Sequence, residues 1–142
     1  MRMNKVCSTN FVKIFKIFNN QLNDIFHKKT KRLKDWSIRA SKGEKLYQYL
    51  KIITTKDDIR IEIDVLFDKV IDDYLFYNYN ILFNNNKLMF HYEPTHHEHF
   101  QPHINVYINQ KELRNQKGEG IHVLSHKYHP FDIIKIIQRY FR

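Results

Sequence analysis

The sequence has a single cysteine, three glycines and three prolines, and it lacks a long uncharged apolar run. One cysteine, Cys7, excludes an intramolecular disulfide framework, as is typical of chains in a reducing compartment. No segment approaches the roughly 20 uncharged apolar residues that a membrane-spanning helix needs. Residues 1–8 contain basic residues but no apolar core followed by small residues, so no signal peptide is expected. We therefore predict a cytoplasmic protein without a membrane span.

Length, composition and charge indicate one folded domain with a basic beginning. The 142 residues are 42% hydrophobic and 15% aromatic, which is too apolar for a disordered chain and enough for a core. Residues 1–45 carry twelve Lys or Arg and three Asp or Glu, whereas residues 46–142 carry twelve of each. The whole net charge of +9 thus lies in the first third, which predicts a surface there for nucleic acid or another acidic partner.

Residues 10–28 carry the apolar stripe of a helix. Between Phe11 and Phe26, apolar residues recur at steps of three and four, the spacing of one helical face. The stripe favours packing on the domain's own sheet. Its alternative is an amphipathic helix that binds a membrane surface or a partner.

A basic run follows this helix over residues 28–34. Its cations suit a phosphate backbone, and the tryptophan after it could stack on a base. The alternative is a solvated helix end whose cations complement the helix dipole, with the tryptophan buried. The predicted nucleic-acid-binding residues are Lys28, Lys29, Lys31, Arg32, Lys34 and Trp36.

From Leu46 onward the apolar period becomes two, which predicts strands. Glu62 and Asp64 would share one strand face, as a metal-binding pair or, more simply, as a solvated face. Asn84, Asn85 and Asn86 separate two strands and predict a β-hairpin. Pro130 fits the first turn of a closing helix.

We predict an α+β domain over 1–142: a helical part over 1–45, then an antiparallel sheet of about five strands, a His-rich loop and a C-terminal helix packed on the sheet over 46–142.

Residues 91–103 hold five of the nine histidines and two carboxylates. Zinc or manganese could be bound there by His97, His99 and His103, with Glu93 or His91 completing the ligand set, although no standard zinc spacing is present. A second interpretation is acid–base cleavage of RNA, in which one histidine takes the 2′-hydroxyl proton and another protonates the leaving oxygen.

The catalytic candidates under that second interpretation are His91, Glu93, His97 and His103. A third interpretation is binding of phosphate or protein without chemistry. A purely structural role, in which the histidines satisfy backbone groups of an irregular loop, stands beside these three.

The run over residues 88–103, followed by a strand and a helix that begins at Pro130, resembles the core of TumE-like proteins. That prokaryotic family combines an aromatic strand ending in Tyr-Asp, a His-His step and a later His. The matching positions are Tyr92, Glu93, His96, His97 and His103. Glu in place of Asp at position 93 keeps the carboxylate but lengthens its reach, and residues 1–45 have no evident counterpart. The resemblance implies a toxin of a toxin–antitoxin pair, with a cognate antitoxin.

We therefore expect a toxin- or defence-type protein that acts on RNA rather than DNA and cleaves its phosphodiester bonds at the His-rich site. The alternative is a non-enzymatic subunit of a toxin–antitoxin or antiphage assembly. That subunit would bind nucleic acid or protein through the helix over 10–28 or through the basic run.

Overall fold

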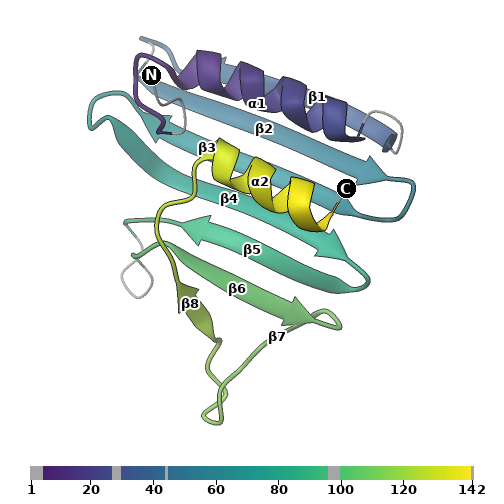
Figure 1. Cartoon of the computed structure of the whole chain (residues 1–142). Helices are drawn as coiled ribbons and strands as arrows, with labels where there is room; N and C mark the ends of the chain where they lie inside the picture. Colours follow the sequence, from purple (N-terminus) through teal and green to yellow (C-terminus); the bar gives the residue numbers. More distant parts are fainter. Residues whose placement is uncertain (1–4, 27–29, 44, 96–99, 142) are drawn as a thin grey trace.

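Within the residues that the computed structural model describes (5–26, 30–43, 45–95 and 100–141, with the backbone alone over 30–36), the chain forms one eight-stranded antiparallel sheet with two helices (Figure 1). The elements in chain order are α1 (Phe11–Phe26), β1 (Thr30–Ala40), β2 (Leu46–Thr55), β3 (Arg60–Asp68), β4 (Asp73–Phe83), β5 (Asn86–Tyr92), β6 (His103–Ile108), β7 (Lys111–Glu112), β8 (His122–Leu124) and α2 (Pro130–Tyr140).

Strands β1 to β7 lie side by side in sequence order, each antiparallel to the one before it. The outer edge of β6 is shared: β7 pairs with its C-terminal end and β8 with its N-terminal end. The predicted hairpin is confirmed, because Asn84 and Asn85 between β4 and β5 have φ angles of 48° and 63°. Asparagine tolerates this left-handed region, which a two-residue hairpin turn requires.

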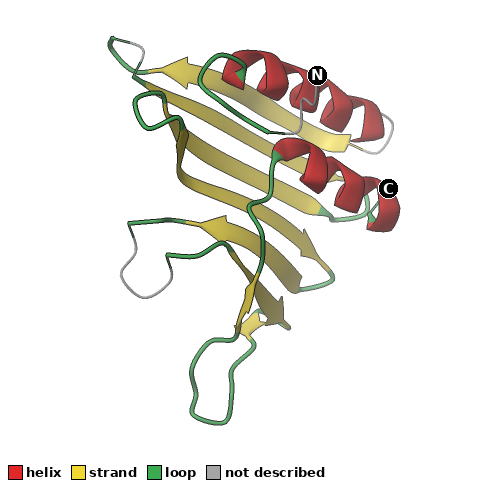
Figure 2. Ribbon diagram, turned by 60° about the vertical axis from the view of Figure 1, so that its left-hand side comes forward, coloured by secondary structure: helices red, strands yellow, loops and turns green. Residues whose placement is uncertain are grey.

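Both helices pack on one face of the sheet (Figures 1 and 2). Most of the stripe of α1 is fully buried there, with the Phe15 ring 4.9 Å from that of Tyr49 and the Phe18 ring 6.3 Å from that of Tyr79. The predicted packing of α1 on the sheet is therefore confirmed, and its stripe is not exposed for a membrane or partner. No helix within the described residues is long and apolar enough to cross a membrane. The sheet's share of the core includes Tyr49, Ile53, Ile61, Ile63, Val65, Phe67, Tyr77, Tyr79 and Ile81.

Lys51 is buried beneath α1 with only 1% of its surface exposed. Its ammonium group donates hydrogen bonds to Asn19 Oδ1 at 2.7 Å and Asn23 Oδ1 at 2.8 Å, and the Tyr49 hydroxyl also donates to Asn19 Oδ1. Burial disfavours the charged form and lowers the pKa of Lys51 to about 8. This polar cluster joins α1 to β2 within an otherwise apolar layer.

Two expectations about the fold are wrong. The sheet has eight strands in the described part of the chain, not about five. Residues 30–40, expected within a helical part over 1–45, form strand β1, because pairing with β2 outweighs a weak local pattern. Residues 109–120 contain the two-residue strand β7 and a bridge between Arg114 and Gly120. Such short pairings leave no period in the sequence.

Titration of Lys51 tests its burial. The pKa of this lysine is about 8 in the folded protein and 10.5 for the ordinary side chain, so between these values the unfolded chain binds more protons. The free energy of unfolding should therefore rise on going from about pH 8 to about pH 9.5, by on the order of 1 kcal/mol. Urea denaturation should show this rise in the wild type and in the exposed control Lys56→Met, but not in Lys51→Met. An unchanged rise in Lys51→Met would contradict the assignment.

Candidate functional site

The face of the sheet opposite the helices, here called the open face, is lined with polar side chains. No helix covers it within the described residues (Figure 2). Side chains that face each other across neighbouring strands lie about 5 Å apart at Cβ, so strand register decides which of them meet. One row across the open face consists of Leu50, Asp64, Asn78, His91 and His103. The next row consists of Ile52, Glu62, Asn80, Met89, Asn105 and His122.

Three imidazoles, here called the histidine row, lie together at the β5–β6–β8 end of the open face. His91 and His103 are direct cross-strand partners, with ring centroids 5.4 Å apart. The ring of His122 lies 4.8 Å from that of His103, because His122 pairs with Asn105, two residues along β6 from His103. Both contacts are edge-to-face. Three neighbouring strands thus contribute one histidine each to a single site.

Each outer histidine has a carboxylate beside it. His91 Nε2 lies 3.6 Å from Glu93 Oε2, and His122 Nε2 lies 3.9 Å from Glu112 Oε1. Carboxylates at such positions orient an imidazole and stabilise its protonated form. The histidine row therefore has proton-accepting groups at both ends.

Glu112 is itself fixed by several neighbours. Its Oε1 accepts a hydrogen bond from Asn105 Nδ2 at 3.1 Å, and its Oε2 lies 3.8 Å from the Arg114 guanidinium. Gly120 makes room for this carboxylate, since a Cβ there would collide with Glu112 Oε1. A larger residue at position 120 would require the Glu112 carboxylate to shift. The contact between Glu112 and Arg114 brings a cation to the His122 end of the row.

His103 is the buried centre of the row, with 3% of its surface exposed. Its Nδ1 lies 2.8 Å from the Gln101 carbonyl oxygen, which can only accept, so Nδ1 carries the proton. In the neutral ring Nε2 is then an acceptor. The outer histidines are more accessible, with side chains 23% and 22% exposed for His91 and His122. Access therefore favours the outer pair for contact with a substrate.

The structure brings three of the four predicted catalytic residues together. His91, Glu93 and His103 all belong to the histidine row or flank it, whereas His97 lies outside the described residues. His122 was not predicted as a site residue. It lies 19 positions after His103 in a strand of three residues, and only the pairing of β8 with β6 brings it next to His103.

The predicted metal and nucleic-acid sites are less completely described. His97 and His99 of the metal site lie outside the described residues, within which no group of three or more His, Cys, Asp or Glu is arranged to hold a metal. Lys28 and Lys29 of the basic run also lie outside them. The remaining four lie on β1, at the opposite edge of the sheet from the histidine row, and their side chains are not described: Lys31, Arg32, Lys34 and Trp36.

No protein-family model matches the chain, and comparisons with curated proteins and with solved structures find no significant match. The resemblance to TumE-like proteins over residues 88–103 therefore stays a prediction.

Truncation of His103 tests its buried position. His103→Ala removes a buried ring and leaves the Gln101 carbonyl without its donor, so the free energy of unfolding should fall by about 1–3 kcal/mol. The exposed His126 serves as the control, and His126→Ala should change stability by less than about 0.5 kcal/mol. Urea denaturation measures both. Equal stability of the two variants would contradict a buried centre of the row.

Proposed function

We propose that the protein is a ribonuclease of toxin or defence type that cleaves single-stranded RNA by acid–base catalysis in the histidine row. The observation that supports this most is the meeting of three imidazoles from three strands on an open polar face, with a carboxylate beside each outer one. Histidine is the side chain whose ordinary titration range best suits proton transfer in both directions at neutral pH.

His91 and His122 are the proposed proton-transfer residues. Their rings flank that of His103, so a phosphate placed over the buried ring would have one imidazole on either side. The neutral histidine accepts the proton of the ribose 2′-hydroxyl as the 2′-oxygen bonds to phosphorus. The protonated histidine donates to the 5′-oxygen as its bond to phosphorus breaks. The products are a 2′,3′-cyclic phosphate and a 5′-hydroxyl.

The neighbouring residues support this chemistry in different ways. Glu93 and Glu112 orient the two outer imidazoles, and Arg114 supplies positive charge near the phosphate. His103 is a positioning residue, because its burial keeps it from direct contact with a polymer.

Asn105 gives a second sign that a ligand belongs at the row. It is 2% exposed, and its Oδ1 has no hydrogen-bond partner within the described residues. Buried polar atoms in native proteins are nearly always paired, with protein, water or ligand. Asn105 directly opposes His122 across β6 and β8, so this acceptor lies beside the row.

The basic strand β1 would bind a part of the RNA that lies far from the cleaved bond. Strand β1 and strand β5 are separated by four strand spacings, or about 19 Å. A single strand of RNA that crosses the open face at right angles to the strands would meet the basic run of β1 first and the histidine row last. The net charge of +9 favours association with such a polyanion.

Replacement of the outer histidines tests the chemistry. His91→Gln and His122→Gln should each lower the rate of RNA cleavage by about 10²–10⁴-fold, because each removes one proton-transfer group. His126→Gln, at an exposed histidine outside the row, is the matched control and should cleave like the wild type. The products should carry a 2′,3′-cyclic phosphate, and a chelator should leave the rate unchanged.

Three outcomes would speak against this mechanism. Cleavage at the wild-type rate by both glutamine variants would show that the histidine row takes no part in the reaction. Loss of cleavage on addition of chelator, restored by zinc or manganese, would favour the metal site expected at His97, His99 and His103. RNA binding without any cleavage, with toxicity on expression retained, would favour the non-enzymatic subunit.

Charge reversal on β1 tests the RNA path. Lys31→Glu combined with Arg32→Glu should weaken RNA binding at least tenfold and reduce its dependence on salt, because fewer counterions are released on binding. The control pair Lys45→Glu and Lys56→Glu changes charge equally at exposed positions and should have a smaller effect. Fluorescence anisotropy over a range of salt concentrations measures both. Equal losses in the two pairs would indicate that only total charge matters.

A further inference from the structure

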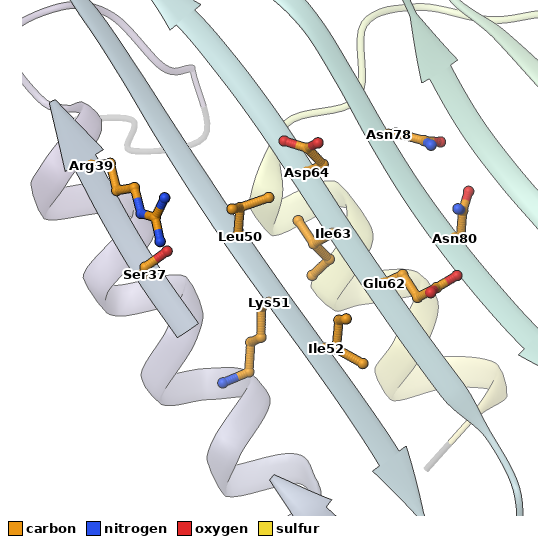
Figure 3. Close-up of a pocket in the computed structure, with 10 residues that line it drawn as sticks. All are labelled: Ser37, Arg39, Leu50, Lys51, Ile52, Glu62, Ile63, Asp64, Asn78 and Asn80. Atoms are coloured by element: carbon orange, nitrogen blue, oxygen red, sulfur yellow. The ribbon is translucent and has the colours of Figure 1, made fainter. Parts of the chain in front are cut away.

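A cavity of about 460 Å³ lies in the open face between β1 and the histidine row (Figure 3). Strands β1 to β4 all contribute to its wall. Figure 3 shows the Glu62 carboxylate extended toward β4, the strand that carries its cross-strand partner Asn80. The residues of its wall on the open face are Ser37, Arg39, Leu50, Ile52, Glu62, Asp64, Asn78 and Asn80.

Four side chains of the wall carry carboxylate or amide oxygen acceptors, and one of them, Glu62, is already paired through its Oε2 with Arg60 at 3.2 Å. Asn78 Oδ1 and Asn80 Oδ1 are both shielded from solvent and have no hydrogen-bond partner within the described residues. Asp64 Oδ1 accepts from Gln48 Nε2 at 3.0 Å, which leaves further lone pairs on its carboxylate. Unpaired buried acceptors cost stability until a donor reaches them. The wall therefore suits a ligand that presents several N–H groups.

The remaining wall residues limit the kind of ligand. Leu50 and Ile52 give an apolar surface that suits the flat face of a ring. Arg39 adds one group that donates only, so the ligand must also carry acceptors. A flat, donor-rich molecule with acceptors on one edge meets these demands, and a simple organic cation does not.

We infer that the cavity is a subsite for a guanine base of the RNA substrate, an inference that rests on the proposed function. Guanine presents three N–H bonds on neighbouring atoms, N1–H and the N2 amino group, which a carboxylate and an amide oxygen can accept together. Its O6 and N7 are the pair of acceptors that arginine binds in bidentate fashion. Adenine and cytosine offer only an amino group, and uracil a single N–H.

The position of the cavity fits this role. Asn78, at its β4 side, is the direct cross-strand partner of His91, so their β-carbons lie about 5 Å apart. A base held by Asn78 and Glu62 therefore belongs to a nucleotide next to the phosphate at the histidine row. The subsite would select the position at which the RNA is cleaved, and the histidine row would catalyse the cleavage.

The test uses four heptanucleotides that differ only in the central base within a uridine background. A 2′-O-methyl group on every ribose prevents cleavage, so fluorescence anisotropy reports binding alone. The wild type should bind the guanine oligomer at least tenfold more tightly than the other three. Glu62→Gln and Asn80→Leu should each reduce that preference to less than threefold, with thermal melting used to show that both variants fold. Asp57→Asn removes an exposed carboxylate in the turn between β2 and β3 and should keep the full preference.

The outcomes separate this inference from the proposed function. Equal affinity for the four oligomers, a preference for another base, or a guanine preference that both cavity variants retain would overturn the guanine subsite. Cleavage of unmodified RNA could still depend on His91 and His122 in each of those cases. A guanine preference that the cavity variants abolish, in a protein that does not cut unmodified guanine-containing RNA, would support the subsite and reject the cleavage.

Discussion

Burial of one face of the sheet under the two helices is the constraint on which the rest of the structure depends. Side chains alternate between the faces of a strand, so the aromatic layer beneath α1 and α2 fixes which residues of each strand point inward. Every residue between them must then lie on the open face. A slip of one residue in any strand would exchange the two sets, which is why the apolar core also determines the position of each polar group.

The two candidate sites follow from this division. His91 and Asn78 face outward because Phe90 and Tyr77, their neighbours in the chain, are buried inward. The sheet is wide enough to place a basic edge, a polar cavity and a histidine row along one line across the strands. Strands of the one sheet carry all three.

Local patterns predicted the parts of this fold that short-range physics decides. The stripe of α1, the alternation in β3 and the asparagine turn between β4 and β5 each have a physical signature within a few residues. Strand β1 was missed because its local pattern is weak and its pairing with β2 decides its structure. For His122, nothing near it in the sequence indicates that it reaches His103, and the second half of the histidine row could not be predicted without the β6–β8 pairing.

Strand β8, which carries His122, is held less firmly than the rest of the sheet. Three residue pairs join it to β6, and Val123 and Leu124 remain 50% and 68% exposed, so little apolar surface holds it down. Local opening of such a segment costs only part of the free energy of global unfolding. His122 could then leave the row while α1, α2 and strands β1 to β5 stay folded. Under the proposed function, heat would stop cleavage at a lower temperature than it unfolds the core, and a molecule that binds β8 and holds it on β6 would raise the cleavage rate without contacting the histidines.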